Sequence, residues 1–348
     1  MSRRASPSVT RTSMAWLLAL SVPCLASRFG PSIRFGSIWR PWSRAFRRPC
    51  WVLTLPCASE SRGIERMPHS ALYALVLVAA VAHASWNAMV KSSGDRLLML
   101  AAIRVVGLLA GVAVAALVPL PAVESLPFLL SAAAVHYLYY ALMLKVYRVG
   151  DMSQVYPIAR GIAPLLVAGL GAILAGEYLG PLSALAVVVL SVGIFFLSGS
   201  GHAANHKAVM LALFTGVAIA GYSVLSGLGV RRAQSLLGYI AWLEIATGLG
   251  MASVAYLRRR PAVVEFVRTQ WRSGLVAGLL SVGGYAIALW AMSVLAMAPV
   301  VALRETSVVF AALIGSVFLR EGFAGRRLAA AAMVLAGIVM LGLGADAG

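Results

Sequence analysis

Ten hydrophobic runs follow one another along residues 70–345 and are separated by short polar or turn-forming segments. A bilayer core requires about 20 residues of helix, so each run of about 18–25 residues predicts a membrane-spanning helix. The runs occupy residues 70–90, 97–118, 127–147, 154–175, 181–199, 208–228, 237–257, 274–296, 298–319 and 327–345. The pattern predicts an all-α membrane protein with one longer loop at residues 258–273.

Polar positions in the first half of this pattern recur about 140 residues later. The matched pairs are Trp86 with Tyr222, Arg104 with Glu244, and Arg160 with Arg304. Such self-similarity predicts two copies of one five-helix unit. Because five is an odd number, the second copy must enter the membrane inverted, which is a recurrent plan of secondary transporters.

The repeat divides the chain into four segments. We expect a basic leader at 1–66, a first repeat at 67–201, a linker at 202–206 and a second repeat at 207–348. The leader carries 11 Arg against two Glu, and its two apolar stretches are too short to span a bilayer. We interpret it as a disordered tail or an upstream mis-extension, with Met67 as the natural start.

Composition narrows the functional class. The chain is 61% hydrophobic and 11% charged, which excludes a water-soluble fold. Its net charge of +18 does not indicate a nucleic-acid partner, because beyond the leader Lys and Arg lie mostly in gaps between apolar runs. All three cysteines lie in the leader, so the body offers no thiol for a nucleophile or a metal site. No serine-nucleophile elbow, zinc-protease motif or phosphate loop is present, so we expect neither an enzyme nor a nucleotide-driven pump, and neither a cofactor nor a metal.

Three local motifs resemble a known family. They are His83-Ala-Ser-Trp86-Asn87-Ala, Tyr156-Pro-Ile-Ala-Arg160 and Leu303-Arg304-Glu305-Thr306-Ser307. Together with the paired five-helix units they resemble EamA-type members of the drug/metabolite transporter superfamily, over about residues 70–346. The resemblance implies a ten-helix bundle around a central cavity, lined mainly by the first, third and fourth helices and their mates, the sixth, eighth and ninth.

Charged residues inside the runs are candidates for the site, since an ionised group at mid-membrane requires a partner or an aqueous cavity. Arg160 and Arg304 lie too deep to reach headgroups. They are predicted either to present forked donors to an anionic or zwitterionic substrate, or to form ion pairs with Glu305 or Glu244. Arg104 is the opposite-charge counterpart of Glu244, which predicts a buried salt bridge between them. Proton coupling through Glu244 or Glu305 is the open alternative.

Polar side chains also form stripes on three helices. The pairs His83 with Asn87, His136 with Tyr140, and Tyr156 with Arg160 are each four residues apart and so share a helix face. With Trp86 and its counterpart Tyr222, they predict a common substrate cavity. The alternative is interhelical hydrogen bonding that only holds the bundle together. Glu177 and Glu321 are predicted to support the N-termini of the fifth and tenth helices.

These observations favour a secondary transporter that exports a small polar metabolite by alternating access. We expect a multi-pass protein of the cell inner membrane that contacts lipid and a small-molecule substrate, as a monomer or homodimer. An intramembrane enzyme and a non-transporting membrane scaffold are the alternatives. The basic gaps follow the odd-numbered helices, which predicts that both termini lie outside, whereas the resemblance implies that both lie inside, so the orientation stays open.

Overall fold

The computed structural model describes residues 68–149, 152–198, 206–312 and 325–345, and within them it contains helices and no strand. The helices are α3 His69–Ser92, α4 Arg96–Ala115, α5 Leu126–Val149, α6 Met152–Ala175, α7 Pro181–Phe196, α8 His206–Arg232, α9 Leu236–Val294, α10 Met297–Glu305 and α12 Gly325–Ala345. A short 3-10 helix at Val123–Ser125 precedes α5, and residues 307–312 are also helical. The predicted leader with its cysteines, Met67, linker residues 202–205 and Glu321 lie outside the described residues.

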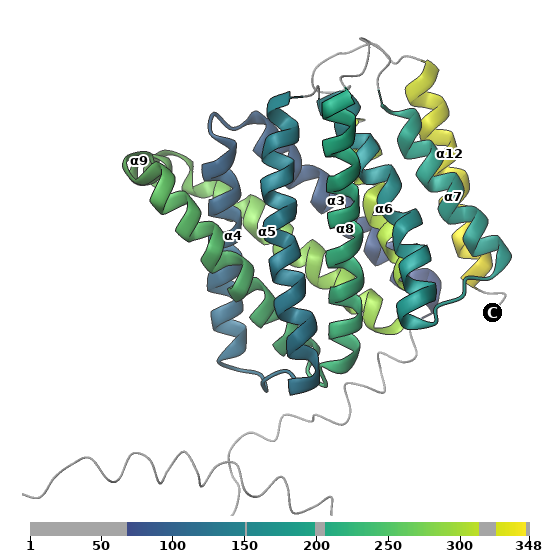
Figure 1. Cartoon of the computed structure of the whole chain (residues 1–348), viewed down its shortest axis with the longest axis horizontal. Coiled ribbons are helices and arrows are strands. Elements are labelled where there is room, and N and C mark those ends of the chain that lie inside the picture. Colours follow the sequence, from purple (N-terminus) through teal and green to yellow (C-terminus); the bar gives the residue numbers. More distant parts are fainter. Residues whose placement is uncertain (1–67, 150–151, 199–205, 313–324, 346–348) are drawn as a thin grey trace, which may run out of the picture. The chain divides into compact units, whose positions relative to one another are not determined.

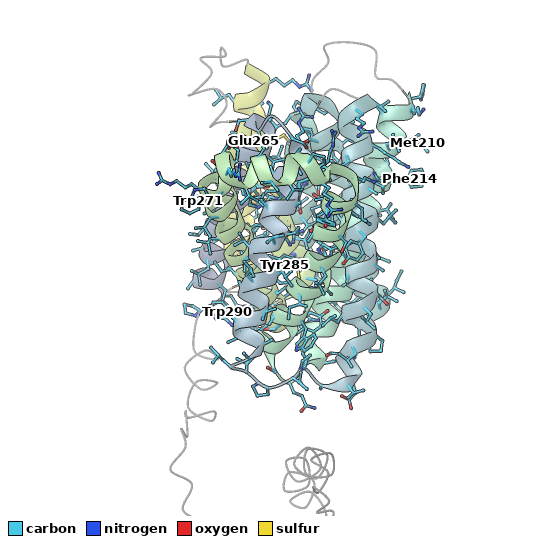
Figure 2. The ribbon with its side chains drawn as sticks, turned by 90° about the vertical axis from the view of Figure 1, so that its left-hand side faces the viewer. Met210, Phe214, Glu265, Trp271, Tyr285 and Trp290 are labelled. Carbon is cyan, nitrogen blue, oxygen red and sulfur yellow. The ribbon has the colours of Figure 1, made fainter. Side chains whose placement is uncertain are left out.

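Six of the described helical segments are long and apolar enough to cross a membrane, which confirms the prediction of an all-α multi-pass protein. They are α3, α4, the stretch 123–146, the stretch 155–175, α8 and α9. Segments 181–196 and 328–344 are apolar but shorter. Large apolar side chains such as Met210 and Phe214 project away from the bundle, as expected for a surface that faces lipid (Figure 2).

The predicted long loop at 258–273 is wrong. These residues are helical and join the seventh and eighth runs into α9, so ten separate helices are not reproduced. The helix is broken at Arg259, where φ is −137° and ψ is 26°, two residues before Pro261. Proline removes a backbone N–H and its ring crowds the preceding turn, which explains the kink. Figure 1 shows α9 as two arms that meet at a bend.

The bundle is held by extensive contact between helices that are distant in sequence. α4 packs along α9, α5 and α6 pack against α8, α3 packs against α9, and α7 packs between α6 and α12. Small residues permit this close approach, since a Cβ atom at Gly111 of α4 would lie 2.6 Å from the backbone oxygen of Ala241 in α9. Helices α3, α4, α5, α8, α9 and α10 thereby bring polar side chains together in the interior.

Candidate functional site

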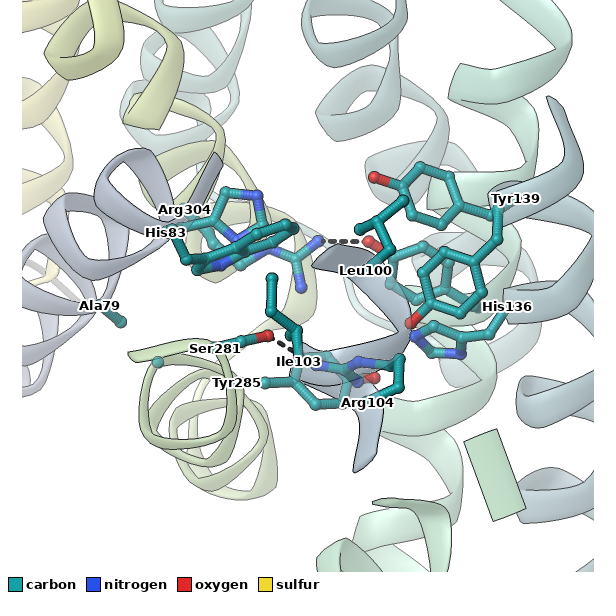
Figure 3. A pocket seen from close by; sticks show the side chains of 14 residues that line it. Ala79, His83, Leu100, Ile103, Arg104, His136, Tyr139, Ser281, Tyr285 and Arg304 are labelled. Carbon is teal, nitrogen blue, oxygen red and sulfur yellow. Dashed lines mark hydrogen bonds between the residues drawn. The ribbon is translucent and has the colours of Figure 1, made fainter. Parts of the chain in front are cut away.

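A narrow cavity lies between α3, α4, α5, α8, α9 and α10 (Figure 3). Its volume is about 50 Å³. This is room for one or two water molecules, which each occupy about 30 Å³ in the liquid. The lining residues are Ala79, His83, Trp86, Leu100, Ile103, Arg104, His136, Tyr139, Tyr140, Tyr222, Ser281, Gly284, Tyr285 and Arg304.

Aromatic rings form much of the wall. His136 stacks on Tyr222 with ring centroids 4.0 Å apart, and Tyr285 meets the same histidine edge-on at 5.7 Å. Tyr139 lies 5.6 Å from Tyr222, and His83 contacts Trp86 at 4.8 Å. Nδ1 of His136 lies 2.8 Å from the carbonyl oxygen of Ala132, which fixes the ring on its own helix. Figure 3 shows His83 and Arg304 on one side of the cavity and His136 and Tyr139 on the other.

Glu305 is shared by two arginines in the interior. Arg160 of α6 donates from Nη1 to Glu305 Oε2 at 2.7 Å, and Arg304 donates from Nη2 to Glu305 Oε1 at 3.0 Å. Arg160 also donates to the Tyr139 hydroxyl at 3.1 Å, and its Cζ lies 5.0 Å from the centre of the Tyr156 ring. An unpaired buried charge is costly, so this carboxylate is what allows both guanidiniums to remain buried.

Arg304 has additional partners on α8. Its Nη2 lies 3.2 Å from the Tyr222 hydroxyl and 3.4 Å from Ser223 Oγ, and its Cζ lies 5.7 Å from the centre of the Tyr222 ring. Its Nε, however, finds no hydrogen-bond acceptor among the described residues. A buried N–H without an acceptor is costly and therefore marks a place where a ligand atom can bind.

A second ion pair closes another side of the cavity. Arg104 of α4 donates from Nη1 to Glu244 Oε2 of α9 at 3.2 Å and from Nη2 to Ser281 Oγ at 2.5 Å. The salt bridge predicted from the repeat is therefore present. Because Glu244 and Ser281 lie on the two different arms of α9, the guanidinium ties both arms to α4.

The interior carries a surplus of positive charge. In the described part of the chain, the buried charged side chains are Arg104, Arg160, Arg304, Glu244 and Glu305. Counted at formal charge, the three arginines and two carboxylates sum to one positive charge. This interior is therefore suited to a ligand with a negatively charged group.

The α10 segment breaks next to these charges. The helix ends at Glu305, and Thr306 forms a turn in which its N–H and its hydroxyl both donate to the Leu303 carbonyl oxygen, at 3.2 Å and 2.6 Å. The turn exists because the threonine hydroxyl competes with the backbone for the carbonyl. Arg304 and Glu305 thus lie at the end of a short, fully buried helix.

The structure brings seven of the predicted site residues to the cavity and leaves others beside it. His83, Trp86, His136, Tyr140, Tyr222, Arg304 and Arg104 line it. Arg160 and Tyr156 line a smaller neighbouring cavity instead, and Glu244 and Glu305 lie behind the arginines that they pair with. Asn87 donates from Nδ2 to the His83 carbonyl oxygen at 2.8 Å, so its amide is held by its own helix.

The sequence reasoning missed Tyr139, Ser281 and Tyr285. Ser281 and Tyr285 are four residues apart on α9, so the rule that selected the other stripes would have found them. Tyr139 follows His136 by three residues and lies on the same face for the same reason.

The predicted role of Glu177 at the fifth helix is wrong. Its Oε2 accepts a hydrogen bond from the Met297 N–H at 2.9 Å, at the start of α10, and its Oε1 pairs with Arg231 of α8. Arg231 in turn donates to the carbonyl oxygens of Met292 and Leu295 at 2.9 Å and 2.7 Å. The carboxylate lies beside a helix N-terminus, as its charge favours, but that helix is distant in sequence.

Comparison with known proteins identifies a family for the second half of the chain. The model of the EamA-like transporter family matches residues 206–343. This segment is an EamA-like transporter module. The predicted resemblance is thereby confirmed for residues 206–343, which include Tyr222, Glu244, Tyr285 and Arg304.

A solved structure described as "Crystal structure of protein" shares the fold of this chain. Its TM-score is 0.61 and its sequence is 18% identical, and the match covers 80% of this chain and 98% of that chain. No curated protein gives a significant match. Among the described residues, no three His, Cys, Asp or Glu side chains come together in a way that could hold a metal ion.

Proposed function

We propose that the protein is a secondary transporter that exports a small polar metabolite bearing a carboxylate, either an anion or a zwitterion, across the cell inner membrane. Two inverted five-helix repeats would alternate between packings that open to opposite sides. The family match begins at residue 206, next to the predicted start of the second repeat, and so supports this division.

One observation carries the proposal. Among the described residues, an aromatic-walled cavity is lined by Arg304, whose Nε–H has no acceptor, and the buried formal charges sum to one positive charge. A carboxylate would satisfy the N–H of Arg304 and neutralise the surplus charge at the same time. An intramembrane enzyme or a membrane scaffold has no evident use for buried arginines that line a cavity.

The size of the cavity supports a cycle of opening and closing. Ligand sites usually occupy about 300–1,000 Å³. A volume of about 50 Å³ therefore requires the helices to separate before a metabolite enters. As they separate, a substrate carboxylate would replace Glu305 at Arg304, while Glu305 stays on Arg160, so no guanidinium is left without an anion.

Transport by purified protein in liposomes tests the proposal. The substrates are labelled amino acids, monocarboxylates, neutral nucleosides and organic cations. We expect exchange of carboxylate-bearing compounds and its loss in Arg304→Gln. Exposed Arg148, at the end of α5, provides the control variant Arg148→Gln, which should transport normally. Transport of cations alone, or normal carboxylate exchange by folded Arg304→Gln, would overturn the proposal.

The surroundings of Glu244 support a role for this residue in proton coupling. Its Oε2 pairs with Arg104, whereas its Oε1 is buried without a hydrogen-bond partner among the described residues. We propose that this carboxylate is a proton-coupling site. A pH gradient should then drive transport by the native protein and fail to drive it in Glu244→Gln, which should retain exchange without a gradient. Unchanged gradient dependence in Glu244→Gln would contradict this role.

A further inference from the structure

The segment of α9 that follows its bend has an unusual arrangement of side chains. Residues 260–272 form a helix that Figure 2 shows, at the Glu265 label, running across the direction of the bundle helices. One face carries Ala262, Val263 and Phe266, which pack against the hydrophobic core. The segment is therefore anchored to the bundle along one side.

The opposite face exposes a second apolar stripe. Val264, Val267 and Trp271 are 56%, 55% and 53% exposed and follow the three- and four-residue spacing of one helix face. In water such a stripe would be unfavourable. A helix that lies across the bundle direction and is apolar on its outer side fits the boundary between the hydrocarbon core and the headgroups, where tryptophan is enriched.

Arginines surround this stripe. Arg258, Arg259, Arg260, Arg268 and Arg272 are all exposed, against one acidic residue in the segment, Glu265. Arg259 is engaged by Asp95 at 3.8 Å. Arg260 and Arg272 lie over the rings of Tyr256 and Trp271, at 5.0 Å and 5.4 Å, which leaves the N–H edges of each guanidinium available to a phosphate.

We propose that residues 256–272 form an interfacial binding surface for anionic phospholipid headgroups of the bilayer in which the protein is embedded. The apolar stripe would enter the acyl boundary, and the arginines would bind headgroup phosphates. A neutral membrane would bury the apolar stripe but would offer the arginines no net negative charge. The positive charge of the segment is therefore the feature that selects anionic lipid. Each arginine near an anionic surface strengthens binding about five-fold.

Thermal unfolding of the full chain in detergent tests the proposal. The probes are dioctanoyl phosphatidylglycerol, dioctanoyl phosphatidylcholine and inorganic phosphate. The native protein should show a higher Tm with phosphatidylglycerol, at concentrations where the other two have little effect. The triple variant R258Q/R268Q/R272Q should require about 100-fold more phosphatidylglycerol for the same shift, on the basis of about five-fold per arginine.

The matched control is Arg232→Gln, compared with R272Q. It removes one exposed arginine at the end of α8, where the first arm of α9 begins, at the far end of that arm from the bend. It should respond as the native protein does. If the triple arginine variant does not fold, the single variant R272Q should show about a five-fold loss. Equal shifts with phosphatidylcholine or with inorganic phosphate, or an equal loss in the control, would overturn the proposal.

Discussion

Glu305 is the residue on which the buried charges depend most directly. It is 0% exposed and accepts hydrogen bonds from both Arg160 and Arg304. Glu305→Gln would leave Arg160 without an anion, and breaking a buried pair in this way typically costs about 3–5 kcal/mol. We expect a loss of that size in the free energy of unfolding, measured by titration with a denaturing detergent. Exposed Glu265 provides the control Glu265→Gln, which should change it little. Equal stability of the two variants would contradict this role.

The pairing of Arg104 with Glu244 predicts energetic coupling between two positions 140 residues apart. Arg104→Gln and Glu244→Gln should each destabilise the protein, and the double variant should cost less than the sum of the two. Contacting residues typically couple by about 0.5–3 kcal/mol. The measurement is a double-mutant cycle of unfolding free energies, and strict additivity would show that the two side chains do not interact in the membrane.

Sequence reasoning at the residue scale succeeded where spacing carried the information. The repeat predicted the Arg104–Glu244 pair, because opposite charges at corresponding positions tend to meet on related faces. The repeat did not predict the partner of Glu177, because contact with Met297 and Arg231 depends on how the α6–α7 connection approaches α8 and α10. The sequence also could not decide between a substrate role and an ion pair for Arg160, since both roles require a buried guanidinium at this position.

At the scale of the helix, the approach of α4 to α9 depends on glycine. Replacing Gly111 by leucine would force its side chain against the Ala241 carbonyl and separate the two helices. Gly169 of α6 is a matched control, since a Cβ atom there would meet nothing within 4 Å. We expect Gly111→Leu to lower the Tm of the detergent-solubilised protein by several degrees and Gly169→Leu to leave it nearly unchanged. Similar Tm values for both variants would contradict the observed packing.

The helices themselves were predictable because a bilayer allows few alternatives. Backbone groups in hydrocarbon must be satisfied internally, so a long apolar run has to be helical. The exception was 258–273, where three arginines and Pro261 were interpreted as a loop. Proline kinked the helix and did not end it, because residues beyond Arg259 could pack Val263 and Phe266 against the core.

For the whole molecule, the helix pattern could be predicted more readily than its packing. In a membrane, apolar residues cover both the surface that faces lipid and the surface that faces other helices. On α7, Leu190 is fully buried while Val188 is 44% exposed, yet the two are equally apolar. The buried charges were the better guide to the interior, since they have no place on the lipid-facing surface.

The central claim is that the polar interior opens to both sides of the membrane in turn. Ile103 of α4 lines the cavity and is 1% exposed, whereas Leu109 of the same helix is 64% exposed on the outer surface. With Cys24, Cys50 and Cys57 replaced by serine, a single cysteine at either position becomes the sole thiol.

The decisive measurement is modification of that thiol by a membrane-impermeant maleimide, applied from one side or the other of oriented vesicles. The account predicts that Ile103→Cys reacts from both sides, more slowly when a transported carboxylate is present, and that Leu109→Cys, buried in lipid, reacts from neither. Reaction of Ile103→Cys from one side alone, in protein that is turning over, would contradict it.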